Sequence, residues 1–177
     1  MLFRSLAGAI FRVNPTNGTQ TTLSTGGYFK HLAGLSLAGS GTIYVTDRGD
    51  GGANLPKIVS INPVSGAQSV VSEGGALQAP AGLAVEPGTG DLIVVDSAAL
   101  LVLRINTGTG VQTVISTGGY FVEPSGVAIE AGGNFIVTEG RAGTTAAERR
   151  VYRVDKKTGA QTVISSGGAL EQPRGVL

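Results

Sequence analysis

The sequence contains no cysteine and no tryptophan, and His31 is its one histidine. The absence of cysteine excludes disulfides, thiolate metal sites and cysteine nucleophiles, but it does not fix the cellular compartment. Charged residues are scarce at 14%, and 13 Lys and Arg against 12 Asp and Glu give a net charge of +1. Nucleic acid binding requires a basic surface that neutralises phosphates, so no nucleic acid partner is expected.

Long apolar runs are also missing. No stretch approaches the ~20 apolar residues that a membrane-spanning helix requires, so we expect no membrane span. Residues 1–11 resemble a short signal peptide in outline, but their apolar core is short and no small-residue cleavage site follows. Because this segment also fits the repeat described below, we assign no signal peptide to it.

Glycine, in contrast, is abundant: it accounts for 29 of the 177 residues, against a usual share of about 7%. The glycines follow no three-residue period, which excludes collagen. Hydrophobic residues make up 41% of the chain, which excludes a disordered chain, since disorder requires low hydrophobicity and high net charge. A composition rich in glycine and poor in charge is typical of many short strands joined by tight turns.

Four sequence markers recur with one shared set of spacings, 48, 44 and 49 residues. The markers are a Gly-Gly pair, a glutamine, a turn-forming Asn or Asp, and a second glycine. Their positions are Gly26, Gly74, Gly118 and Gly167; Gln20, Gln68, Gln112 and Gln161; Asn14, Asn62, Asn106 and Asp155; and Gly34, Gly82, Gly126 and Gly175. This agreement identifies an internal repeat of about 47 residues. We expect units at 1–27 (partial), 28–75, 76–119, 120–168 and 169–177, the last being the start of a further inner strand.

Each full unit contains four strand-length runs, which in one unit are 82–85, 91–96, 101–106 and 111–116. A turn that begins with Asn or Asp and closes with glycine joins the third and fourth runs as a hairpin. Four antiparallel strands repeated every 40–50 residues predict an all-β fold, a β-propeller built of four-stranded blades. A stacked β-solenoid is the alternative. The glycine that opens the first run is expected in the innermost strand, where backbones crowd.

The number of blades does not match a closed ring. At this repeat length the chain holds about 3.8 units, whereas propellers usually contain ~4–8 blades. Two interpretations stay open: the chain is a segment of a longer propeller, or several chains assemble into a ring. We favour the segment, because an assembly would lack one inner hairpin at each junction. An open array exposes strand edges and an apolar blade face, so we expect self-association.

Three stretches carry a family resemblance: Pro-Ser-Gly-Val-Ala-Ile at 124–129, Gly-Asn-Phe-Ile-Val-Thr-Glu at 133–139 and Val-Tyr-Arg-Val-Asp at 151–155. On these residues the sequence resembles the NHL class of six-bladed propellers, across essentially its whole length. The resemblance implies six blades, and its motifs specify a blade rather than a chemistry. One departure is Leu32, where the other units have Pro80, Pro124 and Pro173.

In a propeller, the loops that enter the inner strands and those that leave the second strands share one rim around the central channel, which is the usual binding face. We predict the ligand- or partner-binding residues on this rim. They are Lys30, His31, Asp47, Arg48, Asp96, Glu123, Glu139 and Arg141. The loops 48–56 and 140–150 are the longest irregular stretches of the chain, and functional residues are often found on such loops.

Asp47, Asp96 and Glu139 recur at one position in three units. They predict either a ring of carboxylates that binds a cation, or three acceptors that hold their loops through backbone N–H groups. Repetition in every unit favours the loop-holding interpretation, since a ligand site normally breaks the symmetry. His31 lacks the partner spacing of a general base, so we expect no catalytic residue, and we also expect no metal site and no cofactor.

Two families of propeller enzyme are similar to the sequence at the level of the fold. Gluconolactonase-like enzymes place metal ligands just before the glycine that opens each inner strand, but those positions here are Ala33, Ala81, Ser125 and Arg174. Streptogramin B lyase-like enzymes, similar around 134–139, use histidine chemistry, and this chain offers His31 alone. We therefore predict a non-catalytic binding or scaffold module that recognises a protein or small ligand on the rim. The alternative is a piece of such a hydrolase or lyase whose catalytic residues lie in further blades.

Overall fold

The computed structural model describes residues 2–6, 8–139, 149–167 and 170. Its strands form one three-stranded sheet and three four-stranded sheets, here named A to D in chain order. Sheet A contains β1 (Leu2–Leu6), β2 (Ala9–Val13) and β3 (Gln20–Thr25), and sheet B contains β4 (Leu32–Leu37), β5 (Ile43–Asp47), β6 (Lys57–Ile61) and β7 (Gln68–Glu73). Sheet C contains β8 (Pro80–Val85), β9 (Leu92–Asp96), β10 (Leu101–Ile105) and β11 (Gln112–Thr117). Sheet D contains β12 (Pro124–Ile129), β13 (Phe135–Glu139), β14 (Arg150–Val154) and β15 (Gln161–Ser166).

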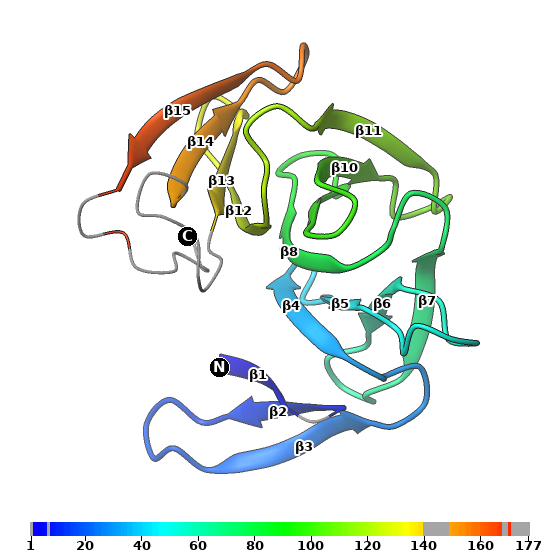
Figure 1. Cartoon of the computed structure of the whole chain (residues 1–177). Helices are drawn as coiled ribbons and strands as arrows, with labels where there is room; N and C mark the ends of the chain where they lie inside the picture. Colours follow the sequence, from blue (N-terminus) through cyan, green and yellow to red (C-terminus); the bar gives the residue numbers. More distant parts are fainter. Residues whose placement is uncertain (1, 7, 140–148, 168–169, 171–177) are drawn as a thin grey trace.

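The four sheets follow one another along an open arc (Figure 1). Within each sheet, neighbouring strands are antiparallel and the strand order is the chain order. The first strands β4, β8 and β12 contact one another along the inner side of the arc. This arrangement confirms the predicted all-β fold and the open propeller of four-stranded blades, with sheet A as a partial blade. The described residues contain no helix, and therefore none that is long and apolar enough to cross a membrane.

The innermost strands approach one another closely, and glycine makes this approach possible. A Cβ at Gly34 of β4 would lie 2.3 Å from the carbonyl oxygen of Ala81 in β8, and a Cβ at Gly82 would lie 2.7 Å from that of Ser125 in β12. Any larger residue would push the two sheets apart. Thr46 adds a hydrogen bond across the first of these junctions, since its hydroxyl donates to the Ala81 carbonyl oxygen at 2.7 Å.

The hydrophobic core consists of three clusters, one between each pair of neighbouring sheets. The clusters are Ile10, Phe29, Ile43, Val45, Val59 and Ile61 (A with B); Ile58, Leu77, Leu83, Leu92, Val94, Leu101, Leu103 and Ile105 (B with C); and Ala81, Ile93, Val95, Val102, Phe121, Val127, Phe135, Val137, Tyr152 and Val154 (C with D). Successive residues of a strand serve different clusters: in β6, Ile58 packs toward sheet C and Val59 toward sheet A. A blade therefore obtains its core only by stacking on its neighbours.

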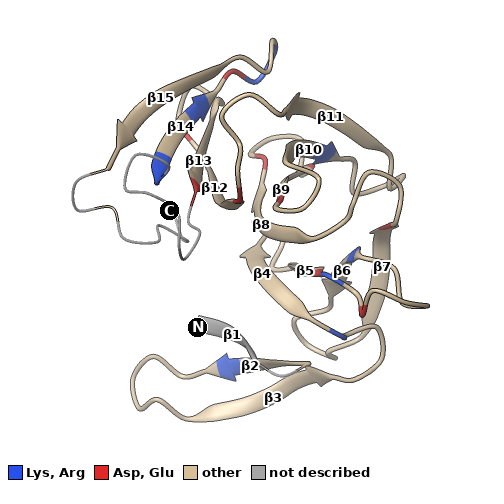
Figure 2. Cartoon of the chain, in the orientation of Figure 1, with Lys and Arg blue, Asp and Glu red and all other residues tan. Residues whose placement is uncertain are grey.

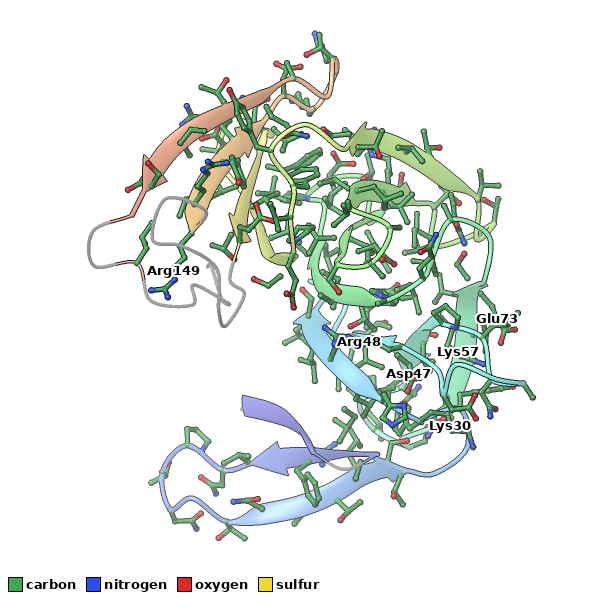
Figure 3. The ribbon with its side chains drawn as sticks, in the orientation of Figure 1. Lys30, Asp47, Arg48, Lys57, Glu73 and Arg149 are labelled. Carbon is green, nitrogen blue, oxygen red and sulfur yellow. The ribbon has the colours of Figure 1, made fainter. Side chains whose placement is uncertain are left out.

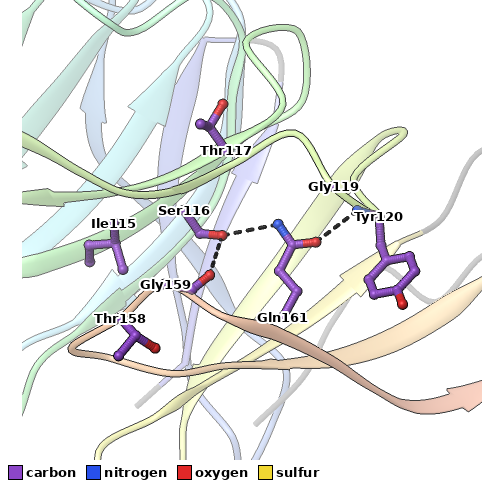
Figure 4. A pocket seen from close by; sticks show the side chains of 8 residues that line it. All are labelled: Ile115, Ser116, Thr117, Gly119, Tyr120, Thr158, Gly159 and Gln161. Atoms are coloured by element: carbon purple, nitrogen blue, oxygen red, sulfur yellow. Dashed lines mark hydrogen bonds between the residues drawn. The ribbon is translucent and has the colours of Figure 1, made fainter.

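The repeated glutamines join the outer strands of neighbouring sheets. Gln161, the first residue of β15, donates through Nε2 to the Ser116 hydroxyl at 3.0 Å (Figure 4). The same nitrogen donates to the Gly118 carbonyl at 3.1 Å. Its Oε1 accepts the Tyr120 backbone N–H at 2.8 Å, and Ser116 donates to the Gly159 carbonyl at 2.7 Å. The same contacts are made by Gln68 with Ser24 and by Gln112 with Ser72. We call this arrangement the junction clamp, and it accounts for the shared spacing of the glutamine and Gly-Gly markers.

Candidate functional site

Strand pairing brings the start of each inner strand beside the end of the second strand of the same sheet. The register pairs Leu32 with Asp47, Pro80 with Asp96, and Pro124 with Glu139. The three carboxylates therefore occupy equivalent places on one rim of sheets B, C and D. Of the predicted site residues, Lys30, His31 and Arg48 are exposed, Glu123 is half-buried, and Asp47, Asp96 and Glu139 are buried. Arg141 lies outside the described residues.

The aspartates hold two loops together. Asp47 Oδ2 accepts the Lys30 backbone N–H at 2.6 Å, and its Oδ1 accepts that of Gly49 at 2.8 Å. Asp96 accepts hydrogen bonds from four backbone N–H groups, two in the loop before β8 and two in the loop after β9. These groups belong to Gln78, Ala79, Ala98 and Ala99, at distances between 2.8 and 3.1 Å. Each aspartate thus ties the loop that enters the inner strand to the loop that leaves the second strand.

Glu139, with a longer side chain, holds the loop that enters the inner strand of sheet D and links it to β14. Its Oε1 accepts the backbone N–H groups of Val122 and Glu123, and its Oε2 accepts the hydroxyl of Tyr152. That hydroxyl also lies 3.0 Å from the Tyr120 carbonyl oxygen. Burial, followed by the hydrogen bond to Glu139, raises the pKa of the Tyr152 phenol above its ordinary value. The phenol therefore stays protonated at neutral pH and remains a donor to the buried carboxylate.

These contacts support the loop-holding interpretation of the three carboxylates over a ring that binds a cation. Their oxygen atoms accept hydrogen bonds from the protein itself, and Asp47, Asp96 and Glu139 are at most 1% exposed. Among the residues that the structure describes, no group of three or more His, Asp or Glu side chains is arranged to hold a metal ion. The exposed charged side chains on the rim of sheet B are Lys30 and Arg48, together with Asp50 and Glu73.

Lys30 and Arg48 lie on the rim of sheet B (Figure 3). Together with the exposed His31 and Tyr28 of the Lys30 loop, we call them the cationic rim patch. Its two backbone segments are joined by hydrogen bonds. The Arg48 N–H donates to the His31 carbonyl at 3.0 Å, and His31 Nδ1 donates to the Gly49 carbonyl oxygen. Because Asp47 also holds the Lys30 N–H, the backbone of the patch is fixed while the side chains of Lys30, His31 and Arg48 reach solvent.

Asp50 is the acidic residue of the loop that adjoins the patch, and its carboxylate is engaged within that loop. It accepts hydrogen bonds from the side chain of Asn54 and from the backbone N–H groups of Gly52 and Asn54. These hydrogen bonds, that of the Asn54 side chain first, hold the pKa of the Asp50 carboxyl below its usual value. Asp50 therefore stabilises the turn of its own loop.

The structure adds two aromatic–cation pairs to the rim that sequence reasoning missed. Lys57 Nζ lies 5.9 Å from the ring centroid of Tyr28 and forms an ion pair with Glu73. The Arg150 guanidinium lies 5.6 Å from the ring centroid of Tyr120. A signal was present, since Ser-Thr-Gly-Gly-Tyr-Phe occurs at both 24–29 and 116–121. In each pair the tyrosine precedes an inner strand, and the cation begins the third strand of the same sheet. The contact between the two side chains therefore joins the Gly-Gly loop to that sheet.

No family model matches the sequence, and no curated protein matches it. The fold is similar to that of a chain in a crystal structure of a nidogen/laminin complex, with a TM-score of 0.80, 16% identity, and coverage of 98% of this chain and 64% of that chain. An auxiliary nutrient binding protein from Bacteroides ovatus matches with a TM-score of 0.66 and 14% identity, over 93% of this chain and 38% of that one. A protein of unknown function from Bacteroides thetaiotaomicron gives a TM-score of 0.73 and 14% identity, over 97% and 48%. The chain thus spans less than two thirds of the length of each, and at these identities the likeness shows the fold alone.

Proposed function

We propose that this chain is a non-catalytic propeller module of the NHL type that binds a protein partner through the cationic rim patch. The observation that carries the proposal is the patch itself: Lys30, His31 and Arg48 are exposed on a backbone fixed by hydrogen bonds. A fixed backbone lowers the entropy lost on binding, which favours recognition. The chemistry that fits the patch is a carboxylate-bearing surface or peptide segment on the partner.

Two further features support this assignment. Charged residues elsewhere on the arc are scattered and form no block of one sign (Figure 2). The exposed Tyr28 ring, which contacts Lys57, adds an aromatic surface to the same rim. Aromatic and arginine side chains are enriched at protein interfaces. The similar chain from the nidogen/laminin structure is itself part of a protein complex. A propeller of this fold therefore occurs in a protein–protein complex.

A charge reversal on the patch tests the proposal. We expect Lys30→Glu combined with Arg48→Glu to weaken binding of a rhodamine-labelled oligoglutamate peptide by at least about tenfold, which corresponds to ~1.4 kcal/mol. The reason is that two attractive charges become repulsive, and the effect should shrink at high salt. Fluorescence anisotropy at low ionic strength measures the dissociation constant.

The matched control is Lys156→Glu combined with Lys157→Glu. These two lysines follow Asp155 in the turn between β14 and β15, on the opposite rim, and their reversal changes the net charge by the same amount. We expect the control variant to bind the peptide about as well as the unmodified chain. Equal losses in the two double variants, or no loss in either, would contradict recognition at the cationic rim patch.

A further inference from the structure

Sheets A and D, at the two ends of the arc, contain the same junction residues as sheets B and C. In the described part of the chain, several of these residues are exposed where their counterparts are buried against a neighbouring sheet. On sheet D, Ser165 is exposed and Ile164 is 47% exposed. Their counterparts one unit earlier are Ser116, which is 6% exposed in the junction clamp, and Ile115, which packs against the cluster between sheets C and D. We call the side of sheet D formed by Val151, Ile164, Ser165 and Gly167 the trailing face.

Sheet A shows the complementary situation. Phe11 and Val13 of β2 are half-buried, whereas their counterparts in the other three sheets are 0% exposed. Those counterparts are Val59 and Ile61, Leu103 and Ile105, and Tyr152 and Val154. Gln20, which is equivalent to the clamp residue Gln161, is exposed. We call the side of sheet A formed by Phe11, Val13, Gly18 and Gln20 the leading face.

Gly18, whose backbone has φ +73° in its turn, also has the small size that a packed junction needs. At Gly66, Gly110 and Gly159, the equivalent glycines, a Cβ would lie 1.9, 2.5 and 2.0 Å from a carbonyl oxygen of the preceding sheet. At Gly18 a Cβ would meet nothing within 4 Å. Among the described residues, the space beside Gly18 is therefore open to a close sheet–sheet approach like those at Gly66, Gly110 and Gly159.

We infer that the leading face of one copy of this chain docks on the trailing face of a second copy, and that it repeats the contacts that the third and fourth strands make at the internal junctions. Gln20 of the first copy then donates to the Ser165 hydroxyl and the Gly167 carbonyl of the second copy, and this Ser165 donates to the Gly18 carbonyl of the first copy. Phe11 and Val13 cover Val151 and Ile164. The occupant is a second copy because each residue of one face corresponds to a residue that contacts the other face inside the chain.

The two faces lie at opposite ends of the arc (Figure 1). The contact is therefore heterologous, with two different surfaces meeting, so each copy retains one free face after the first contact. Association then continues until a ring closes or the chains are exhausted. Burial of the exposed apolar side chains of both faces provides the driving force.

Sedimentation velocity over a range of protein concentrations tests this inference. We expect the mass of the unmodified chain to rise with concentration. Gln20→Lys blocks the leading face, and Ser165→Lys blocks the trailing face. For each variant alone we expect the dissociation constant of self-association to rise by at least about tenfold, so that the variant is monomeric at concentrations where the unmodified chain associates. Both positions are exposed, so both variants should keep the unmodified thermal transition by circular dichroism. Val64→Lys, at an 87% exposed turn residue away from both faces, adds the same charge and should associate as before.

Mixing the two blocked variants gives the sharpest result. The Gln20→Lys chain still has a trailing face and the Ser165→Lys chain still has a leading face, so the mixture should form a 1:1 heterodimer that grows no further. Three results would overturn the inference: an unmodified chain that is monomeric at every concentration, association that survives either lysine, and a mixture that stays monomeric.

Discussion

Asp96→Ala is expected to lower the free energy of unfolding by about 3–5 kcal/mol, since a buried donor left without an acceptor costs about 1–3 kcal/mol. The carboxylate is 0% exposed and accepts hydrogen bonds from four backbone N–H groups. Its removal leaves these amides without their acceptor in a site that water reaches poorly. Urea unfolding followed by circular dichroism measures the change.

The control for this prediction is Asp91→Ala in the same sheet. Asp91 is half-buried, and its carboxylate accepts a side-chain hydrogen bond from Asn106 at 3.1 Å. Its replacement removes the same charge and should cost at most about 1 kcal/mol. Asp96→Asn keeps one acceptor oxygen and should fall between the two. If Asp96→Ala lowers the free energy of unfolding no more than Asp91→Ala does, then Asp96 does not anchor its loops. A ligand-binding role for the rim carboxylates would then be the better interpretation.

Gly66→Ala is expected to destabilise the junction between sheets A and B by about 3 kcal/mol or more. Two costs combine at this position. The backbone has φ +72°, where a non-glycine residue pays ~1–2 kcal/mol. The new Cβ would lie 1.9 Å from the Leu23 carbonyl oxygen, so sheet A must move away and the hydrogen bond from the Ser24 hydroxyl to Gly66 is strained.

Gly18→Ala separates the two costs. Gly18 has nearly the same backbone conformation, φ +73°, but has open space where the Cβ would be. At a low protein concentration, where copies do not associate, Gly18→Ala should lower the free energy of unfolding only by the cost of the positive φ, ~1–2 kcal/mol. Equal losses in the two variants would contradict the close approach of the β6–β7 turn to Leu23 of β3.

The strands were predictable from the sequence because the turn residues punctuate the chain at fixed places. The run expected at 91–96 is β9 (Leu92–Asp96), and the run expected at 101–106 is β10 (Leu101–Ile105). The hairpin between the third and fourth strands has a local cause: Asn62 Oδ1 accepts the backbone N–H groups of Val64 and Ser65. Interactions this short in sequence can be inferred without the fold.

The candidate site was less predictable, because the environment of a rim residue depends on segments far apart in the chain. Asp47 and Arg48 are neighbours in sequence, yet one is buried and the other exposed. The pairing of Tyr28 with Lys57 likewise depends on how the Gly-Gly loop packs against the next sheet. The sequence predicted which loops share a rim, but the assembled sheets determine which side chains of those loops reach solvent.

The central claim is that the cationic rim patch recognises carboxylate-bearing partners. Amide chemical-shift mapping by NMR during titration with an unlabelled oligoglutamate peptide tests it most directly, because it shows where on the propeller the peptide binds. Recognition by the cationic rim patch predicts that the largest shifts fall at residues 28–31 and 47–49 and disappear in the Lys30→Glu, Arg48→Glu variant. Shifts centred on the turn at 155–159 of the opposite rim, or on the trailing face of sheet D, would contradict the account.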